Sequence, residues 1–343
     1  MAVEILPFGS EQQFQSVAQL WNSLLPGYQV PAAHLRSLLQ DKRGSHYVAC
    51  SCTCKTLTAR VCTSNCPVIG FVGTYVDEST FDQDEQKGHI AVSLVDAGFQ
   101  NKGVGTQLLN HACDTLLRTH GCNTIVLGSV FPRFWPGVPT DIPSKDQAFF
   151  KKTLQRHALL QLSDACPCRD LYIELDDYTV PAAVMRRVAE AGINFTPLDV
   201  KDAEQCIRKQ RQNFKNDGWV AAYEELVSKG HSQQIMVAYN SDRQQVGWTL
   251  MVEADLPVWD TLAFPHLLGH KTGLIACVGV DADARGAGIG LALVGSALKD
   301  LQRRGARHVF VDWVVLHGWY EKLGFMTWRE YQTLTWRVVD AAT

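Results

Sequence analysis

The sequence runs twice from a β-prone segment through a glycine-rich turn into a helical pattern. In the second half, the apolar segment 273–280 leads into Arg285-Gly286-Ala287-Gly288-Ile289-Gly290. Apolar residues then recur at spacings of three and four up to position 304, which predicts an amphipathic helix. A strand that enters a helix in this way leaves backbone N–H groups free at the first helical turn, where the helix dipole attracts anions.

The first half repeats this order in a degraded form. A β-prone segment at 89–95 leads into Gln100-Asn101-Lys102-Gly103-Val104-Gly105-Thr106, and a helical pattern follows to position 117. The similarity continues outside the glycine-rich turns: 3–8 resembles 193–198, and each is followed by a helical pattern and two β-prone stretches. An internal repeat of this length predicts two tandem domains. We expect an N-terminal domain at 1–176, a linker at 177–192 that contains Pro181 and a short helix, and a C-terminal domain at 193–343.

The glycine spacing excludes two common nucleotide-binding motifs. A dinucleotide fingerprint has the spacing G-x-G-x-x-G, whereas Arg285-x-x-Gly288-x-Gly290 begins with arginine. The phosphate loop G-x-x-x-x-G-K-[ST] does not occur in the sequence.

Composition excludes further classes of function. The 32 Lys and Arg residues nearly balance the 35 Asp and Glu residues, so we expect no nucleic-acid partner. We expect no signal peptide, because the first seven residues lack a basic n-region and an apolar core. We also expect no membrane partner, because no apolar run reaches the roughly 18 residues that a membrane span needs. Eleven cysteines, an odd number scattered along 343 residues, suit a reducing compartment, and we expect a cytoplasmic protein. The sequence does not predict the oligomeric state.

One cysteine cluster allows two interpretations. Its members are Cys50, Cys52, Cys54, Cys62 and Cys66. Four of these thiolates could bind zinc. Alternatively, the segments on either side form the two strands of a hairpin, and the cysteines are small half-buried residues. We favour the hairpin and expect no metal.

Two motifs in the second half resemble the GCN5-related N-acetyltransferases (GNAT). One is the R-x-x-G-x-G turn after a strand, and the other is the string Trp319-Tyr320-Glu321-Lys322-Leu323-Gly324-Phe325, which follows the predicted strand 308–313. The resemblance implies an α/β fold of the α+β type: two tandem GNAT domains, each with a central mixed sheet flanked by helices. It also implies acetyl-CoA as the co-substrate.

The resemblance further implies which residues hold the coenzyme. In this superfamily the strand before the turn splays from its neighbour, and the pantetheine arm lies along it. The implied contacts to the pantetheine arm are main-chain groups of the strand residues Cys277, Val278, Gly279 and Val280. The implied contacts to the pyrophosphate are the side chain of Arg285 and the backbone N–H groups of Gly286, Ala287, Gly288, Ile289, Gly290 and Leu291. An N–H group near Val278 would face the thioester carbonyl. Arg285 could instead be an ordinary surface arginine.

Two residues are candidates for the catalytic groups. Tyr320 resembles the superfamily tyrosine that protonates the leaving thiolate, and we expect it to open a helix. Asp312, at the end of the strand before it, could accept the amine proton. Alternatively Tyr320 packs on the sheet and Asp312 caps the strand end. His317, five residues after Asp312, is the rival base.

The first half differs where chemistry is expected. Phe149-Phe150 stands in place of Trp319-Tyr320, and phenylalanine has no proton to donate. Asp312 has no carboxylate counterpart at the end of the corresponding strand. The first domain therefore reads as catalytically degenerate. Its loop is still a possible second coenzyme site, formed by Gln100, Lys102, Gly103, Val104, Gly105 and Thr106.

The acceptor amine is suggested by a closer resemblance. Val311-Asp312-Trp313, the string 319–331 and the Pro-rich segment 128–139 resemble the glucosamine and glucosaminide N-acetyltransferases of chitin and amino-sugar metabolism. The tandem organisation is also similar to mycothiol synthase. The sugar-binding candidates are Trp313, His317, Phe134 and Trp135, with Phe131 as a further aromatic face, although Phe134 and Trp135 could simply pack within their own domain. The alternatives are acetylation of a protein, a peptide or another small amine, and a non-catalytic acyl-CoA-binding protein.

Overall fold

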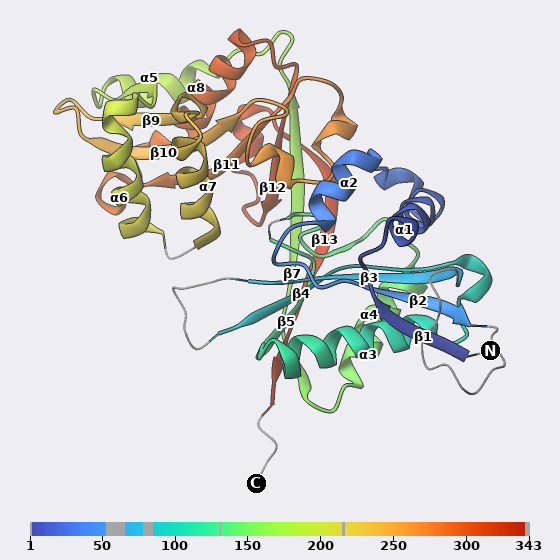
Figure 1. The fold of residues 1–343 in the computed structure, drawn as a ribbon. Coiled ribbons are helices and arrows are strands. Elements are labelled where there is room, and N and C mark those ends of the chain that lie inside the picture. Colours follow the sequence, from blue (N-terminus) through green and yellow to red (C-terminus); the bar gives the residue numbers. More distant parts are fainter. Residues whose placement is uncertain (1, 53–65, 78–84, 131, 215–216, 340–343) are drawn as a thin grey trace. The chain divides into compact units, whose positions relative to one another are not determined.

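The computed structural model describes residues 2–52, 66–77, 85–130, 132–214 and 217–339 (Figure 1). Cys54, Cys62 and Phe131 lie outside the described residues, and the side chain of Cys52 is not described either. The described chain forms two compact units. The first contains the residues up to Pro167 together with those from Tyr331 onward, and the second contains Cys168–Glu330.

The first unit is built on a mixed sheet with the strand order β1-β2-β3-β4-β5-β13. Only β4 and β5 are parallel neighbours, and the other adjacent pairs are antiparallel. A short strand, β6, pairs with the start of the first unit's part of β13. The bounds of these strands are β1 Ala2–Pro7, β2 Tyr47–Cys52, β3 Val68–Val76, β4 Lys87–Val95, β5 Thr124–Leu127, β6 Val138–Pro139 and β13 Met326–Val338.

The second unit repeats this arrangement with the order β8-β9-β10-β11-β12-β7. Again only the fourth and fifth strands, β11 and β12, are parallel neighbours. The internal repeat of the sequence is therefore a repeat of sheet topology. The bounds are β7 Leu160–Glu174, β8 Asn194–Pro197, β9 Ile235–Tyr239, β10 Gln245–Val252, β11 Thr272–Val280 and β12 His308–Val314.

The sixth strand of each sheet comes from the other half of the sequence. Leu334–Arg337 of β13 pairs with β5 in the first unit, and Leu171–Glu174 of β7 pairs with β12 in the second. The units therefore differ from the expected domains 1–176 and 193–343: residues 168–176 belong to the second unit, and those from Tyr331 onward belong to the first. Hydrophobic alternation identifies a strand but not its partner, which is why the sequence did not predict this exchange.

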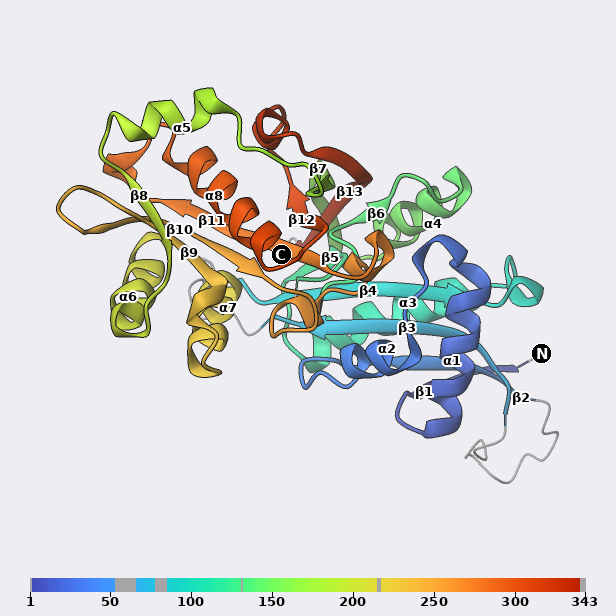
Figure 2. The same cartoon turned by 90° about the horizontal axis from the view of Figure 1, so that it is seen from above.

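Helices cover both faces of each sheet (Figures 1 and 2). In the first unit α1 and α2 lie on one face and α3 and α4 on the other; in the second, α6 and α7 lie opposite α5 and α8. Their bounds are α1 Glu11–Leu24, α2 Ala32–Leu39, α3 Val104–Asp114, α4 Ser144–Gln155, α5 Ala182–Ala189, α6 Ala203–Asn213, α7 Asp217–Ser228 and α8 Ile289–Arg303. The expected mixed α/β fold is thus present in both units.

Local signals explain where these helices begin and which side they bury. At the start of α1, Ser10 and Gln13 form a reciprocal capping box that satisfies two free N–H groups. Leu108 and Leu109 of α3 and Leu293 and Leu298 of α8 are fully buried against their sheets, as the three- and four-residue spacing predicts.

The cysteine-containing segment follows the hairpin interpretation where it is described. Strands β2 and β3 pair antiparallel, and Cys50 of β2 is buried. Among the described residues, no three His, Cys, Asp or Glu side chains converge as metal ligands would. The described helices include none with the length and apolar character of a membrane span.

A buried histidine makes the stability of the first unit depend on pH. The Nε2 atom of His46 lies 3.1 Å from the Leu39 carbonyl oxygen, and the backbone N–H of Thr74 donates to Nδ1 at 3.2 Å. Nδ1 is therefore the unprotonated nitrogen. Burial lowers the pKa of His46 to about 4, although the Leu39 carbonyl and Asp41 partly oppose this shift. Because protonation in the folded state breaks the bond from Thr74, the neutral ring is the form that folding selects.

We predict that the first unit loses stability as the pH falls from about 6.5 towards 4, since the unfolded chain binds the proton more tightly than the folded one. Between pH 7 and 5 the expected loss is about 2 kcal/mol in the free energy of unfolding. Urea denaturation at both pH values measures it. His46→Gln, which does not titrate, is the control and should show a smaller loss. Equal losses in the two proteins would contradict the assignment.

Candidate functional site

In the second unit, strand β11 leaves its neighbour β12 after three residues. Thr272–Leu274 pairs with His308–Phe310, and no further pairing between these strands is present in the described chain. On the other side, the register with β10 shifts between Ala276 and Gly279, which places one extra residue in β11. Cys277, in this bulge, has the left-handed φ of 52°. A bulge bends the strand that contains it, so β11 splays from β12 here.

Two side chains hold the bulge in place. The Tyr223 hydroxyl of α7 donates to the Cys277 carbonyl at 2.8 Å, and the Thr249 hydroxyl of β10 donates to the Ala276 carbonyl at 3.0 Å. Tyr223 and Thr249 are both fully buried. The bend in β11 is therefore built into the core and leaves one edge of the strand available between Ala276 and Val280.

The glycine-rich turn connects β11 to α8. Gly288 lies at the N-cap of α8 with a left-handed φ of 85°, and no described side chain caps this helix. The Arg285 Nε atom donates to the Val280 carbonyl at 3.0 Å. Arg187 of α5 reaches the same turn and donates to the Gly286 carbonyl at 2.6 Å. Two guanidinium groups thus flank the positive end of the α8 dipole, a suitable setting for a pyrophosphate.

Two glycines of the site allow close packing. A Cβ atom on Gly290 would lie 3.1 Å from the Trp319 ring, so Trp319 packs directly on the first turn of α8. A Cβ atom on Gly279 would lie 1.8 Å from the Phe214 ring, which covers β11 on its other face. At Gly286, by contrast, an added Cβ atom would meet nothing within 4 Å, so that part of the turn faces open space.

Tyr320 lies in a single 3-10 turn, Tyr320–Leu323, which ends at Gly324. Tyr320 therefore opens a helical segment that ends at Gly324, as expected, but the segment is a single 3-10 turn, which the left-handed Gly324, with φ 95°, ends. Tyr320 is buried, with its ring 4.6 Å from that of Trp319 and 5.5 Å from that of Phe325. Burial raises the pKa of Tyr320 well above its ordinary value, and the charges of Asp312 and Cys277 add to the shift. The phenol consequently keeps its proton at neutral pH, as a general acid requires.

Asp312 and Trp313 form a second bulge, in β12. Its register with β7 shifts between Val311 and Val314, so that both residues lie opposite Asp170. Trp313 has the left-handed φ of 49°, and its N–H group donates to the Asp170 carboxylate at 3.0 Å. Asp312 and Trp313 are half-buried. His317 is exposed, in a loop whose residues Val315 and Leu316 are also exposed.

Sequence reasoning missed three residues near this site. Arg187 lies in the segment expected to be a linker, and Arg169 and Asp170 lie in the segment expected to belong to the N-terminal domain. Arg187 carried no sequence signal beyond its charge. Arg169 and Asp170 could have been noticed only if β7 had been paired with β12.

The first unit has a similar backbone arrangement but lacks counterparts of the candidate acid Tyr320 and the candidate base Asp312. Strand β4 pairs with β5 only up to Ile90, and its register with β3 shifts at Ala91. Gly103, with φ 83°, is the N-cap of α3, which no described side chain caps. The Gln100 Nε2 atom donates to the Val95 carbonyl at 3.1 Å, the same bond that Arg285 makes to Val280. Gln100 thus keeps the structural contact of the arginine but not its charge.

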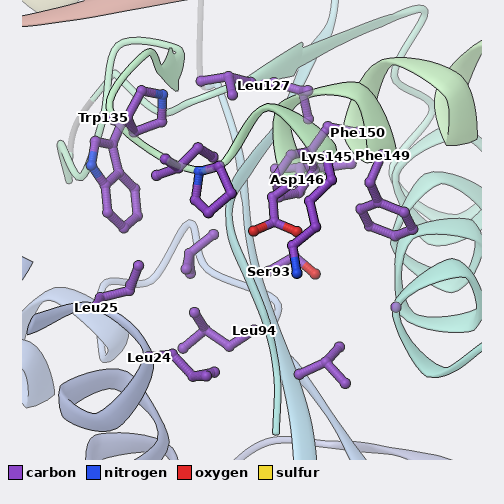
Figure 3. Close-up of a pocket in the computed structure, with 18 of the residues that line it drawn as sticks. Leu24, Leu25, Ser93, Leu94, Leu127, Trp135, Lys145, Asp146, Phe149 and Phe150 are labelled. Atoms are coloured by element: carbon purple, nitrogen blue, oxygen red, sulfur yellow. The ribbon is translucent and has the colours of Figure 1, made fainter. Parts of the chain in front are cut away.

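A cavity of about 540 Å³ lies beside this loop (Figure 3). It is bounded by β4, the loop residues from Gln100 to Thr106, the end of α1 and the start of α4. Figure 3 shows Lys145 and Asp146 reaching from α4 towards the strand that carries Ser93. Phe149 and Phe150 line the apolar part.

The Pro-rich segment of the first unit is largely buried. Phe134 packs 5.4 Å from the ring of Trp21 and is 1% exposed, so it offers no face to a ligand. Trp135 stacks on Trp21 at 5.4 Å and also lines the cavity. Both belong to the first unit, whereas Asp312, Trp313, His317 and Tyr320 belong to the second.

Comparisons with known proteins agree on the family. The sequence profile of the acetyltransferase (GNAT) family matches residues 17–132 and again residues 200–325. No curated protein matches the sequence.

Solved structures resemble the whole chain. The glucosamine N-acetyltransferase region of a fungal multi-domain GH3 β-N-acetylglucosaminidase is 27% identical with a TM-score of 0.84; the match covers 97% of this chain but only 38% of that one. A GCN5-related N-acetyltransferase from Sphaerobacter thermophilus shares the fold at 13% identity and a TM-score of 0.68, covering 99% of this chain and 97% of that one. A tandem GNAT protein from the clavulanic acid biosynthesis pathway also shares the fold, at 15% identity and a TM-score of 0.63. That match covers 99% of this chain and 100% of the other.

Proposed function

Because the chain belongs to the GNAT family of acetyltransferases, we propose that its second unit transfers an acetyl group from acetyl-CoA directly to the primary amine of glucosamine or a glucosaminide, in a ternary complex. The observation that carries the proposal is that buried Tyr320 lies near enough to Asp312 and Cys277 for their charges to raise its pKa, where β11 leaves β12. A candidate proton donor and a candidate proton acceptor are thus available near an open strand edge. This is the arrangement that acyl transfer to an amine requires.

The residues of the second unit suit acetyl-CoA. The open edge between Ala276 and Val280 can pair with the amides of a pantetheine arm, and the uncapped N-terminus of α8 can bind the pyrophosphate. Arg285 and Arg187 add positive charge on either side, and Gly286 leaves room for the phosphates. When bound, acetyl-CoA supplies an activated thioester.

Each step then has a residue of this chain to support it. The N–H group of Val278, directly after the bulge residue Cys277, is our candidate donor to the carbonyl oxygen, a contact worth about 2.7–4 kcal/mol in comparable sites. Asp312 accepts the proton that the attacking amine loses, directly or through one water. Tyr320 donates its proton to the sulfur as the carbon–sulfur bond breaks. The phenol is protonated at neutral pH, so its proton is available when the thiolate departs.

The amino-sugar acceptor rests on a narrower basis. It is supported by the 27% identity over 97% of this chain with a region described as a glucosamine N-acetyltransferase. Half-buried Trp313 can offer a ring face to a sugar beside Asp312, and exposed His317 can contact its hydroxyl groups. The segment 311–319 contains no Lys or Arg to bind a sugar phosphate, which favours an unphosphorylated acceptor. A protein, peptide or other small amine is the alternative acceptor, and a non-catalytic acyl-CoA-binding role is the alternative function.

We predict that the purified protein releases free coenzyme A thiol from acetyl-CoA when glucosamine or a glucosaminide is added. A thiol-reactive dye measures the release, and acetyl-CoA without an amine gives the hydrolysis background. Glucosamine 6-phosphate and a lysine peptide are the comparison acceptors. If only the peptide were acetylated, the acceptor assignment would be overturned; no release with any amine would favour the non-catalytic alternative.

We further predict that Asp312→Asn and Tyr320→Phe lower kcat, each by about tenfold to ten-thousandfold, because each removes one proton transfer. Coenzyme A binding, measured by calorimetry, should stay within about twofold, since both variants leave the residues of the glycine-rich turn unchanged. Tyr178→Phe is the matched control: it makes the same change in the same unit, and the Tyr178 hydroxyl has no hydrogen-bond partner among the described residues. Wild-type kcat in both site variants would remove these assignments.

For the first unit we propose a coenzyme-binding role without catalysis, through Gln100, Lys102, Gly103, Val104, Gly105 and Thr106. The bulge in β4, the uncapped α3 and the adjoining cavity support binding. Phe149 and Phe150, in the middle of α4, supply neither acid nor base.

We therefore predict that Gln100→Ala combined with Gly103→Trp leaves kcat within about twofold of wild type, because the reacting groups lie in the second unit. Calorimetry should find one coenzyme A site fewer than in the wild type. Circular dichroism controls for folding. A folded variant that had lost all turnover would show that the first unit takes part in the reaction.

A further inference from the structure

Two consecutive side chains of β7 contact the segments that carry the proposed acid and base. Asp170 is 3% exposed and Arg169 is 8% exposed. Both lie in the part of β7 that pairs with β12. Neither belongs to the glycine-rich turn or to the motif around Tyr320, so neither is among the groups assigned above.

Asp170 stabilises the bulge that contains Asp312. In a bulge, two residues face one on the partner strand, so one N–H group loses its ladder partner. Here that group is the N–H of Trp313, and the Asp170 carboxylate accepts it at 3.0 Å. The bond also holds Trp313 at a φ of 49°, which a bulky side chain rarely adopts. The direction of Asp312, immediately before Trp313, consequently depends on Asp170.

Arg169 holds the segment that follows. Its guanidinium group forms an ion pair with Glu321 at 2.9 Å, donates to the Leu316 carbonyl at 3.0 Å and donates to the Thr327 hydroxyl at 3.1 Å. Glu321 comes directly after Tyr320, and Leu316 lies in the exposed loop between Asp312 and Tyr320. The buried guanidinium group of Arg169 thus anchors one residue before Tyr320 and two residues after it.

We propose that Arg169 and Asp170 are positioning residues for the C-terminal site: Asp170 sets the orientation of Asp312, and Arg169 sets that of Tyr320. This inference rests on the proposed function, since it assigns the two residues to the same reaction. It does not give them contact with substrate or coenzyme. A displacement of about 1 Å in reacting groups can cost up to a hundredfold in rate, so these contacts are expected to matter for turnover.

The first experiment compares kinetics with coenzyme binding. Asp170→Ala and Arg169→Met should each lower kcat by about tenfold to a hundredfold. The KM for acetyl-CoA and the calorimetric affinity for coenzyme A should stay within about twofold, because the turn between Arg285 and Leu291 is untouched. Asp170→Asn should recover most of kcat, since its amide oxygen can accept the same N–H bond. Asp176→Ala, which removes only an exposed ion pair with Arg307, is the matched control in the same unit.

The second experiment does not depend on activity. Hydrogen–deuterium exchange of the segment 311–323 should become about tenfold faster in Asp170→Ala and Arg169→Met, while a peptide from the middle of α8 should exchange as in the wild type. If the β7 variants fail to fold, Glu321→Ala tests the same contact, because it removes the ion pair with Arg169 from a half-exposed turn. It should loosen the same segment and lower kcat without a change in coenzyme A affinity.

The outcomes separate the two proposals. Wild-type protein without transfer to any amine would overturn the proposed function, whatever the exchange data show. Active wild type together with variants of unchanged kcat, or unchanged exchange of 311–323, would overturn the positioning role. A parallel loss of coenzyme affinity, kcat and α8 protection would also overturn it, since it would show that Arg169 and Asp170 support the whole unit.

Discussion

The separation of β11 from β12 is the constraint on which the rest of the second unit depends. Parallel strands normally continue to pair once they are aligned, and unpaired strand edges are costly. Here pairing ends after Leu274, and the Cys277 bulge turns β11 away. The carbonyl groups on either side of the bulge accept hydrogen bonds from Tyr223 and Thr249, which compensates part of the lost pairing. The core therefore stabilises an opening in the sheet, and the glycine-rich turn, Asp312 and Tyr320 belong to the segments around it.

A bulge also occurs in the corresponding strand of the first unit, where the register of β4 with β3 shifts at Ala91. Its loop is tied by Gln100 to Val95 as Arg285 is tied to Val280. The two units thus share a bulged strand and an uncapped helix start, and they differ in the side chains proposed to react. A fold can be kept while the side chains at its site change.

Local patterns in the sequence predicted most of the elements and the outline of the site. The apolar spacing after Gly290 predicted α8, and the repeat predicted two similar units. The sequence did not predict the features that depend on contacts between residues far apart in the chain. The partner of β7 depends on pairing across more than a hundred residues, so Arg169 and Asp170 were not connected with Asp312. The bulge at Trp313 depends on Asp170, which lies far away in the sequence, and the apolar pattern did not reveal that the helix opened by Tyr320 is a single 3-10 turn.

The exchanged strands have a consequence for how the protein is made. The first unit has its sheet from β1 to β5 once about 130 residues have been synthesised, but the strand that pairs with β5 is Leu334–Arg337, about 200 residues further along the chain. While the ribosome produces the second half, the edge of β5 has no native partner and is open to mispairing with other chains. The first unit can therefore complete its sheet only after Leu334–Arg337 has been synthesised. A nascent chain of this protein should depend on chaperones longer than one with two self-contained domains.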